Sequence, residues 1–328
     1  QIGGHYDRAG IPDQAAAFYY RGALAAEAIY AHESAIRILE RALQLVEKVS
    51  PPDLMLSLRV EYLERLGDIL DFVGRHANAR AIFSDALAAV TPFEAIEHSQ
   101  LLRKIGKTHE GQRNFEMALA TYSEAEETLL ERPTRSIPAW WHAWIQVQLE
   151  RLWIYYWTNE WRKSAKLAAS IRPSVEQYGD PAQQINYYLV RGSTLCLEHR
   201  YRIPDEALNL TRLSLQLAQE NDDLGQIAWT RFVFGFCLLW KRDFDQSETQ
   251  ILSALDVAEA RGDLVHQARC TTYLAIIGRF RGDLDMTQRY ARSALETAQT
   301  VQMVEYEATA SANLGWAAWR RQEMASAV

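Results

Sequence analysis

The sequence contains few cysteines, and their arrangement bears on the compartment in which the protein works. Only three occur in 328 residues, at Cys196, Cys237 and Cys270, and none of them forms a Cys-x-x-Cys pair. An odd and sparse set of cysteines argues against a secreted disulfide framework and is typical of a reducing environment. We therefore expect a cytoplasmic protein.

Long apolar runs and basic clusters are also missing. The most apolar stretch, residues 229–240, is shorter than a membrane-spanning helix and is interrupted by Thr230 and Arg231. No run of five basic residues occurs, and 35 lysines and arginines against 42 aspartates and glutamates give a formal net charge of −7. The sequence thus predicts neither a membrane protein nor a nucleic-acid-binding surface. Because the chain begins at Gln1 rather than at methionine, we expect it to be a segment of a longer protein.

Motifs for nucleotide or metal binding begin in this sequence without being completed. The triplet Gly-Lys-Thr at 106–108 matches the end of a phosphate-binding loop, but that loop needs a glycine where Leu101 stands. The His-Glu pairs at 32–33 and 109–110 lack the second histidine that a zinc-binding helix carries four residues after the first. We expect no cofactor and no metal, and we expect residues 106–108 to lie within a helix.

What the sequence does contain is an internal repeat. Gly235, Ala275 and Gly315 are each 40 residues apart, and similar residues surround them. The motif at 241–245 (KRDFD) follows the first of these landmarks, and the motif at 281–285 (RGDLD) follows the second. We expect both motifs to occupy a turn between two helices, with the first aspartate capping a helix. Periods in this range are typical of solenoids.

The same pattern occurs earlier, where Gly67 and Gly106 are 39 residues apart. Gly67 is followed by small and aromatic residues: Gly74, Ala79, Phe83 and Ala86. With them the pattern resembles the tetratricopeptide repeat (TPR), in which small residues let the two antiparallel helices approach closely and the aromatic residue fills the gap between successive repeats. The resemblance covers residues 13–328 and implies an all-α fold, an α-solenoid of antiparallel helix pairs in a TPR-like superhelix, with about 15 helices and no sheet. It is poorest over 132–205, where we place the landmarks near Leu152 and Leu195.

Prolines agree with this arrangement at most positions. Pro12, Pro181 and Pro204 stand where helices should begin, and Asp180 can cap the helix that starts at Pro181. Pro173 falls inside an expected second helix and should kink or break it.

The proline-containing segment 132–138 is the best candidate for a linker. We expect a junction at 1–12, an N-terminal TPR lobe at 13–131, this linker, and a C-terminal TPR lobe at 139–328 whose last repeat is truncated.

The opening segment, residues 5–43, resembles the point at which repeats begin after the ATPase module of large bacterial signalling proteins. These proteins include LuxR-type ATP-dependent regulators and nucleotide-cyclase-linked ATPases of the AAA/STAND type. Residues 140–161 and 267–270 are similar to the same group. This resemblance implies that the repeats are the sensor or scaffold region of a bacterial signalling or transcription-regulating ATPase.

The first helix of each repeat is expected to line the inner face, because residues three and four apart share one side of a helix. In the N-terminal lobe this spacing selects charged residues: Glu61, Glu64, Asp68, Asp71, Arg103 and Lys107. They either form a charged groove for a partner or pair with one another across repeats.

In the C-terminal lobe the same spacing selects aromatic residues with arginines beside them: Trp153, Tyr156, Trp157, His199, Trp229, Phe232, Phe236, Trp240, Arg279, Phe280, Trp316, Trp319 and Arg320. They either form the core between helices or line a groove that buries the anchor residues of a partner.

We therefore consider two functions for this chain. The first is a non-catalytic module that binds a protein, a peptide or a small effector and acts on an attached ATPase. The alternative is a stand-alone peptide receptor of the Rap type, whose repeats are of similar length. An enzyme is disfavoured, because no nucleophile, base and orienting residue can be grouped from the sequence.

Overall fold

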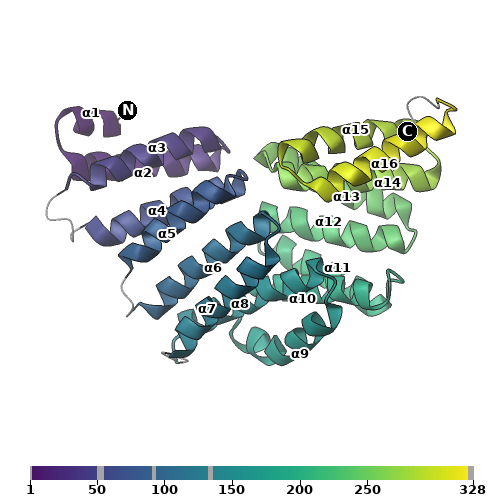
Figure 1. The fold of residues 1–328 in the computed structure, drawn as a ribbon, viewed down its shortest axis with the longest axis horizontal. Coiled ribbons are helices and arrows are strands. Elements are labelled where there is room, and N and C mark those ends of the chain that lie inside the picture. The colour runs from purple at the N-terminus through teal and green to yellow at the C-terminus, as the bar shows by residue number, and fades with distance from the viewer. Residues whose placement is uncertain (1, 50–54, 91–93, 132–135, 324–328) are drawn as a thin grey trace. The chain divides into compact units, whose positions relative to one another are not determined.

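The structure is a computed structural model that describes residues 2–49, 55–90, 94–131 and 136–323. Within these ranges the chain forms sixteen helices and no strand (Figure 1). The all-α solenoid of helix pairs predicted from the 40-residue period is confirmed, and the helix count is one above the expected number.

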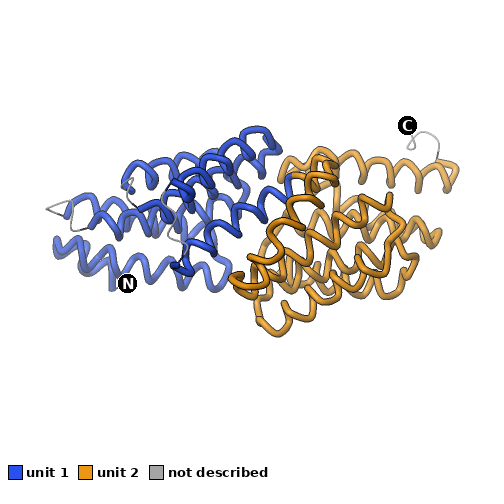
Figure 2. The backbone as a smooth tube through the Cα atoms, turned by 90° about the horizontal axis from the view of Figure 1, so that it is seen from below, with its two compact units in different colours: residues 1–154 blue, residues 155–328 orange. Residues whose placement is uncertain are grey.

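The helices belong to two compact units, residues 1–154 and residues 155–328 (Figure 2). The first unit holds α1 (Ile2–Arg8), α2 (Pro12–Ala28), α3 (His32–Val46), α4 (Leu56–Phe72), α5 (His76–Ala89), α6 (Ala95–Gly111), α7 (Phe115–Glu131) and most of α8 (Pro138–Trp157). The second holds α9 (Trp161–Tyr178), α10 (Pro181–Glu198), α11 (Asp205–Glu220), α12 (Leu224–Trp240), α13 (Phe244–Arg261), α14 (Leu264–Arg281), α15 (Leu284–Thr300) and α16 (Val304–Arg320).

The boundary between the units lies inside α8, after Ile154. The sequence placed a linker at 132–138, of which residues 132–135 lie outside the described ranges. Most of α8 packs with the first unit, because Trp140 is buried beside Leu129 of α7 and donates its indole N–H to the Leu129 carbonyl at 3.0 Å. Ile154, further along α8, joins a core cluster with Tyr122.

In two helix pairs of the first unit, a glycine of the first helix faces an aromatic ring of the second helix. A Cβ atom added at Gly67 would lie 2.4 Å from the ring of Phe83, which is only 1% exposed. The same relation holds between Gly106 and Tyr122, where the distance would be 2.3 Å. Only a residue without a side chain fits at such distances, so the TPR-like packing expected at these landmarks is confirmed.

The middle of the array uses a different glycine. In α10 the close approach is made by Gly192, where an added Cβ would lie 2.9 Å from Thr211 of α11. Leu195, the landmark expected there, is one helical turn later and is buried. The repeat pattern is therefore present in this pair but shifted by a turn, which explains its weak match in the sequence.

The turns within the pairs also repeat. Gly74, Arg113, Arg242 and Gly282 all have a positive φ, between 62° and 81°, directly after the first helix of their pair. A left-handed residue at this position ends the helix and reverses the chain. After this turn, Asp243 accepts a hydrogen bond from the Gln246 amide, which confirms the expected helix cap.

Prolines behave as predicted with one exception. Helix α2 begins at Pro12 and α10 begins at Pro181, where Asp180 forms the expected cap with Gln183. Pro173 does not break its helix, because α9 continues through it to Tyr178. Neighbouring turns hold this helix in place, with Ile171 and Val175 buried on either side of the proline.

In the second unit, the first helices of successive pairs contact one another directly: α10 with α12, α12 with α14, and α14 with α16. The second helices, α11, α13 and α15, each pack on the first helices before and after them. The layer of first helices, called here the first-helix face, therefore brings together residues that are 40 positions apart in the sequence.

We expect Gly67→Ala to destabilise the chain by about 1–3 kcal/mol, because the new methyl group must displace the buried ring of Phe83. Gly22→Ala is the matched control. Its added Cβ would lie 3.8 Å from the nearest atom, Ile38 Cγ2, so alanine should raise stability by up to about 1 kcal/mol through helix propensity. Thermal melting followed by circular dichroism measures both changes. A Gly67→Ala chain as stable as the wild type would contradict this packing.

Candidate binding face

Acidic residues predicted for a charged groove in the first unit are mostly paired with neighbouring bases. Lys104 Nζ lies 2.8 Å from Glu64 and 2.6 Å from Asp68, so α6 reaches back to two carboxylates of α4. Asp71 lies 2.7 Å from the His76 ring. Burial, together with a hydrogen bond to Glu61, raises the pKa of Tyr20 to about 12.

The predicted bases of this groove meet at a carboxylate that the sequence analysis missed. Glu150 on α8 accepts hydrogen bonds from Arg103 at 3.2 Å, from Lys107 at 3.1 Å and from Gln146 at 3.0 Å. Lys107 also lies 2.8 Å from Glu110. We call Arg103, Lys107, Glu110 and Glu150 the Glu150 cluster. Glu150 belongs to no recognisable sequence motif. Its role as the shared partner of Arg103 and Lys107 becomes visible only when the helices are placed in space.

The pKa values in the Glu150 cluster follow its charges. Burial acts to raise the pKa of Glu150, but the charges of Lys107 and Arg103 outweigh it, and the pKa lies below its usual value. Burial raises the pKa of Glu110, the charge of Lys107 does not outweigh this effect, and the charge of Glu150 raises that pKa further. Burial acts to lower the pKa of Lys107, but the two carboxylates outweigh it and raise that pKa.

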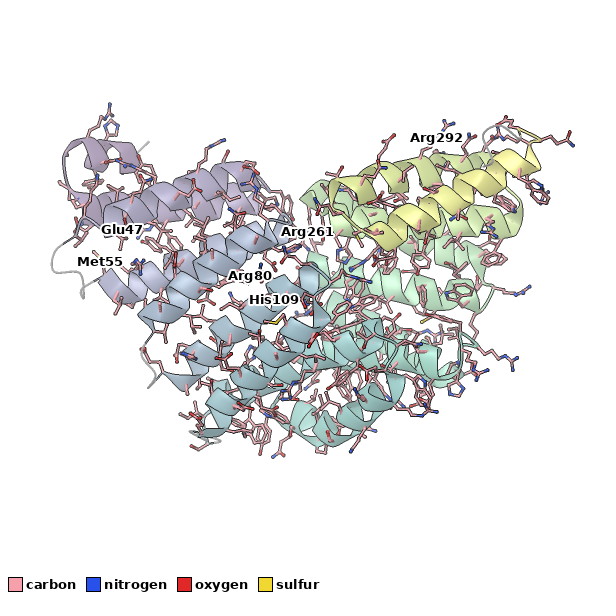
Figure 3. All side chains as sticks on the ribbon, in the orientation of Figure 1. Glu47, Met55, Arg80, His109, Arg261 and Arg292 are labelled. Atoms are coloured by element: carbon pink, nitrogen blue, oxygen red, sulfur yellow. The ribbon has the colours of Figure 1, made fainter. Side chains whose placement is uncertain are left out.

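Further polar contacts tie α5 to α6. Arg80 donates to Gln112 at 2.8 Å and approaches His109, and Figure 3 labels the two side chains on adjacent helices. Burial lowers the pKa of His109, and the charge of Arg80 lowers it further. The charges of the first unit thus pair largely among themselves, which favours the alternative in which they stabilise the repeats over a charged groove for a partner.

Aromatic residues run continuously along the first-helix face of the second unit. Phe232 and Phe236 of α12 both pack edge-on against Tyr273 of α14, with ring centres 5.5 Å and 5.2 Å apart. Phe236 also lies 6.2 Å from Trp240. Trp240 in turn lies 6.1 Å from Phe280 of α14.

This aromatic row is partly core and partly surface. Phe232 and Phe236 are only 5% and 7% exposed, so they support the face from beneath and are not available to a partner on the free chain. Trp153, which belongs to the first unit, is also buried. The remaining aromatic residues predicted for the groove keep solvent-accessible surface, which is largest at Trp319 and Phe280 and partial at Trp229, Trp240, Trp316, Tyr156 and Trp157; His199 is also exposed.

Arginine side chains pack on the rings of tryptophans on this face. The guanidinium of Arg269 lies 5.1 Å from the ring centre of Trp229 and 5.6 Å from that of Trp157. One turn earlier, His266 lies 2.7 Å from Asp263. Burial acts to raise the pKa of Asp263, but the hydrogen bond and charge of His266 outweigh it and lower that pKa.

The most exposed part of the face lies where α14 and α16 end. Arg279 and Arg320 both approach the ring of Trp316, with distances of 5.6 Å and 5.4 Å from Cζ to the ring centre. Phe280, next to Arg279 in the sequence, is 51% exposed, and Trp319, next to Arg320, is 56% exposed. We call Arg279, Phe280, Trp316, Trp319 and Arg320 the terminal patch. The sequence predicted all five residues for a groove, and the structure places them on the ends of two adjacent helices.

The three cysteines are buried thiols. Cys196 of α10 and Cys237 of α12 face each other with 3.7 Å between their sulfurs. Their mutual hydrogen bond and burial raise the pKa of Cys196, and burial raises that of Cys270 to about 12. Neutral, buried thiols are poor nucleophiles and poor metal ligands.

The described residues provide neither a membrane-spanning helix nor a cluster of metal ligands. No helix there combines the length and apolar character needed to span a bilayer. No group of three or more histidine, cysteine, aspartate or glutamate side chains in those ranges is arranged to hold a metal ion.

Sequence comparisons give no relatives: no protein-family model matches the chain, and no curated protein matches it either. Solved structures do match in fold. A Rap conjugation gene regulator in complex with a Phr peptide aligns with a TM-score of 0.68 at 13% identity, over 88% of this chain and 74% of that one. A Rap protein complexed with competence and sporulation factor aligns with a TM-score of 0.61 at 14% identity, over 95% and 94%.

A third structure connects the fold to larger proteins. The Signal Transduction ATPase with Numerous Domains (STAND) from Pyrococcus horikoshii, which has a tetratricopeptide repeat sensor, aligns with a TM-score of 0.57 at 16% identity. The match covers 87% of this chain but only 42% of that protein. The fold is thus a TPR-like helical array of the kind found in Rap proteins and in TPR sensors of STAND ATPases.

We expect Glu150→Gln to destabilise the chain by about 2–4 kcal/mol at pH 7, because Arg103 and Lys107 lose their shared carboxylate. The lowered pKa of Glu150 means that its contribution is complete above its usual pKa and is lost as the pH falls through the folded-state value. The difference in stability from the wild type should therefore shrink in acid, below about pH 4.

Glu127→Gln, an identical change at an exposed position of α7, is the control and should leave stability unchanged. Urea denaturation at neutral and acidic pH measures both variants. If the two substitutions had an equal effect on stability at pH 7, the Glu150 cluster would not stabilise the chain as expected.

Proposed function

We propose that this chain is a non-catalytic binding module that recognises a protein or peptide through the first-helix face of its second unit. The observation that carries the proposal is the terminal patch, where large aromatic side chains and arginines remain exposed on adjacent helices. Exposed tryptophan and arginine are the residue types that dominate binding energy at protein interfaces. Aromatic surface of this kind is otherwise kept out of water.

The fold supports the same proposal. One Rap protein of this fold is described in complex with a Phr peptide and another in complex with competence and sporulation factor, and the STAND protein is described as having a tetratricopeptide repeat sensor. By analogy, the chain would bind a protein, a peptide or a small effector in the cytoplasm. Two settings are open to it: the sensor region of a signalling ATPase, or a stand-alone receptor of the Rap type. The sequence of the gene upstream of Gln1 distinguishes these settings.

An enzymatic function is less well supported. One structure of similar fold, with a TM-score of 0.51, is described as an aspartyl phosphate phosphatase from Bacillus subtilis. At 13% identity that likeness concerns the fold alone. In the present chain the thiols are buried, and Lys107 of the incomplete phosphate-loop triplet is engaged by Glu110 and Glu150.

Peptides selected from a random phage library on the immobilised chain test the proposal. We expect Trp319→Ala and Trp316→Ala each to weaken a selected peptide by about 30-fold, equivalent to about 2 kcal/mol at an interface hot spot. Both variants should keep the melting temperature of the wild type, because these side chains are exposed or only partly buried.

Phe232→Ala is the contrasting variant. Its ring is buried, so its truncation should cost about 3–5 kcal/mol of stability. The proposal fails if no peptide is selected, or if selected peptides bind the two tryptophan variants as tightly as the wild type. It also fails if those variants lose as much stability as Phe232→Ala, since the tryptophans would then belong to the core.

A further inference from the structure

The two arginines of the terminal patch share one aromatic platform. The Cζ atoms of Arg279 and Arg320 both lie within 5.6 Å of the centre of the Trp316 ring, although the residues come from different helices. In such a cation–π contact the flat face of the guanidinium packs on the ring, while the guanidinium N–H groups point outward and can still donate hydrogen bonds. Both arginines are exposed, so these donors are turned to a surface that a ligand can reach.

Neighbouring arginines at the same helix ends behave differently. Arg281 pairs with Asp245 and Glu248, and Arg321 pairs with Asp285. Among the described residues, no carboxylate lies within ion-pairing distance of Arg279 or Arg320, even though two like charges converge on one ring. In the part of the chain that the structure describes, acidic partners therefore lie beside Arg281 and Arg321 and none lies beside the two arginines of the terminal patch.

A structural explanation accounts for only part of this arrangement. Arginine near the end of a helix interacts favourably with the helix dipole, and an exposed cation–π contact contributes about 0.5–1 kcal/mol. Neither effect calls for two arginines on one indole, nor for the exposed Phe280 and Trp319 that adjoin them in the sequence. Two cations with no carboxylate beside them in the described ranges, next to apolar surface, are complementary to a carboxylate-bearing ligand with a bulky apolar side chain.

We propose that the terminal patch binds an acidic peptide segment, in which aspartate or glutamate lies next to an aromatic or leucine residue. The carboxylates accept hydrogen bonds from Arg279 and Arg320, and the apolar side chain packs on Trp319 and Phe280. A nucleic acid is the less suitable anion, because the net charge of the chain is −7 and repels an extended polyanion. This inference rests on the proposed function and adds the chemistry of the partner.

The experiment uses the full chain with three fluorescein-labelled probes: an enriched peptide from the phage selection, the same peptide with each acidic residue changed to its amide, and a single-stranded oligodeoxynucleotide. We expect the enriched peptides to be acidic and to contain an aromatic or leucine residue. Fluorescence anisotropy should show that Arg279→Gln/Arg320→Gln weakens the acidic peptide by about 30-fold or more, since two charge-assisted hydrogen bonds are lost. The amide peptide should bind the wild type equally weakly.

Arg289→Gln/Arg292→Gln is the matched control. These two arginines are exposed on α15 and lie outside the first-helix face; Arg292 is labelled in Figure 3. Their substitution removes the same total charge as the substitution of Arg279 and Arg320. This variant should change the affinity for the acidic peptide by no more than about 2-fold, as expected for distant surface charges that salt screens.

The outcomes separate this inference from the proposed function. Selected peptides that are neutral or basic, or that bind Arg279→Gln/Arg320→Gln as tightly as the wild type, overturn the acidic-peptide proposal. If those same peptides still need Trp316 and Trp319, the proposed function stands without it. Oligonucleotide binding that matches the peptide affinity and is lost in the arginine variant also overturns the proposal. A selection that yields no peptide overturns both.

Discussion

The close approach of the two helices in each repeat is the constraint on which the rest of the structure depends. At Gly67 and Gly106 the second helix comes so near that its aromatic residue occupies the place of a side chain. In these two pairs the helices cannot separate without exposing a buried ring. Because the pairs are alike, they stack with their first helices in contact, as α12, α14 and α16 do. Within the second unit, a continuous face of first helices follows from this stacking.

The first helices of the two units differ in the side chains that they present. In the first unit, bases from α6 meet acids from α4 and α8, and the Glu150 cluster is the point where this pairing is densest. In the second unit the same layer is aromatic, with buried rings such as Phe236 beneath and exposed rings such as Trp319 at the helix ends. Charge that is balanced within the chain contributes to stability, whereas aromatic and cationic surface without a partner is suited to binding.

The sequence predicted the features that depend on local spacing. A period of 40 residues defines the helix pairs, and the helix-capping role of Asp243 and the start of α10 at Pro181 follow from their immediate neighbours. Gly192 was not recognised because the central pair shifts its close contact by one turn, and a shift is visible only when both helices are placed. The continuity of α9 through Pro173 depends on its packing in the same way.

The sequence predicted which residues lie on the first-helix face better than it predicted which of them are buried. Helical spacing selects Phe232 and Trp319 alike, since both lie at inward offsets, but only contacts with the next first helix decide which one is covered. Glu150 and Tyr273 were missed for the same reason, because their partners are far away in the sequence.

Hydrogen–deuterium exchange of the full chain, with and without a selected peptide, tests the central claim most directly. The account predicts slower exchange on binding at the ends of α14 and α16, within residues 276–282 and 316–322, and unchanged exchange in α13 and α15. Protection confined to the helices of the first unit, or to the second helices of the repeats, would contradict the claim that the aromatic first-helix face is where this protein binds.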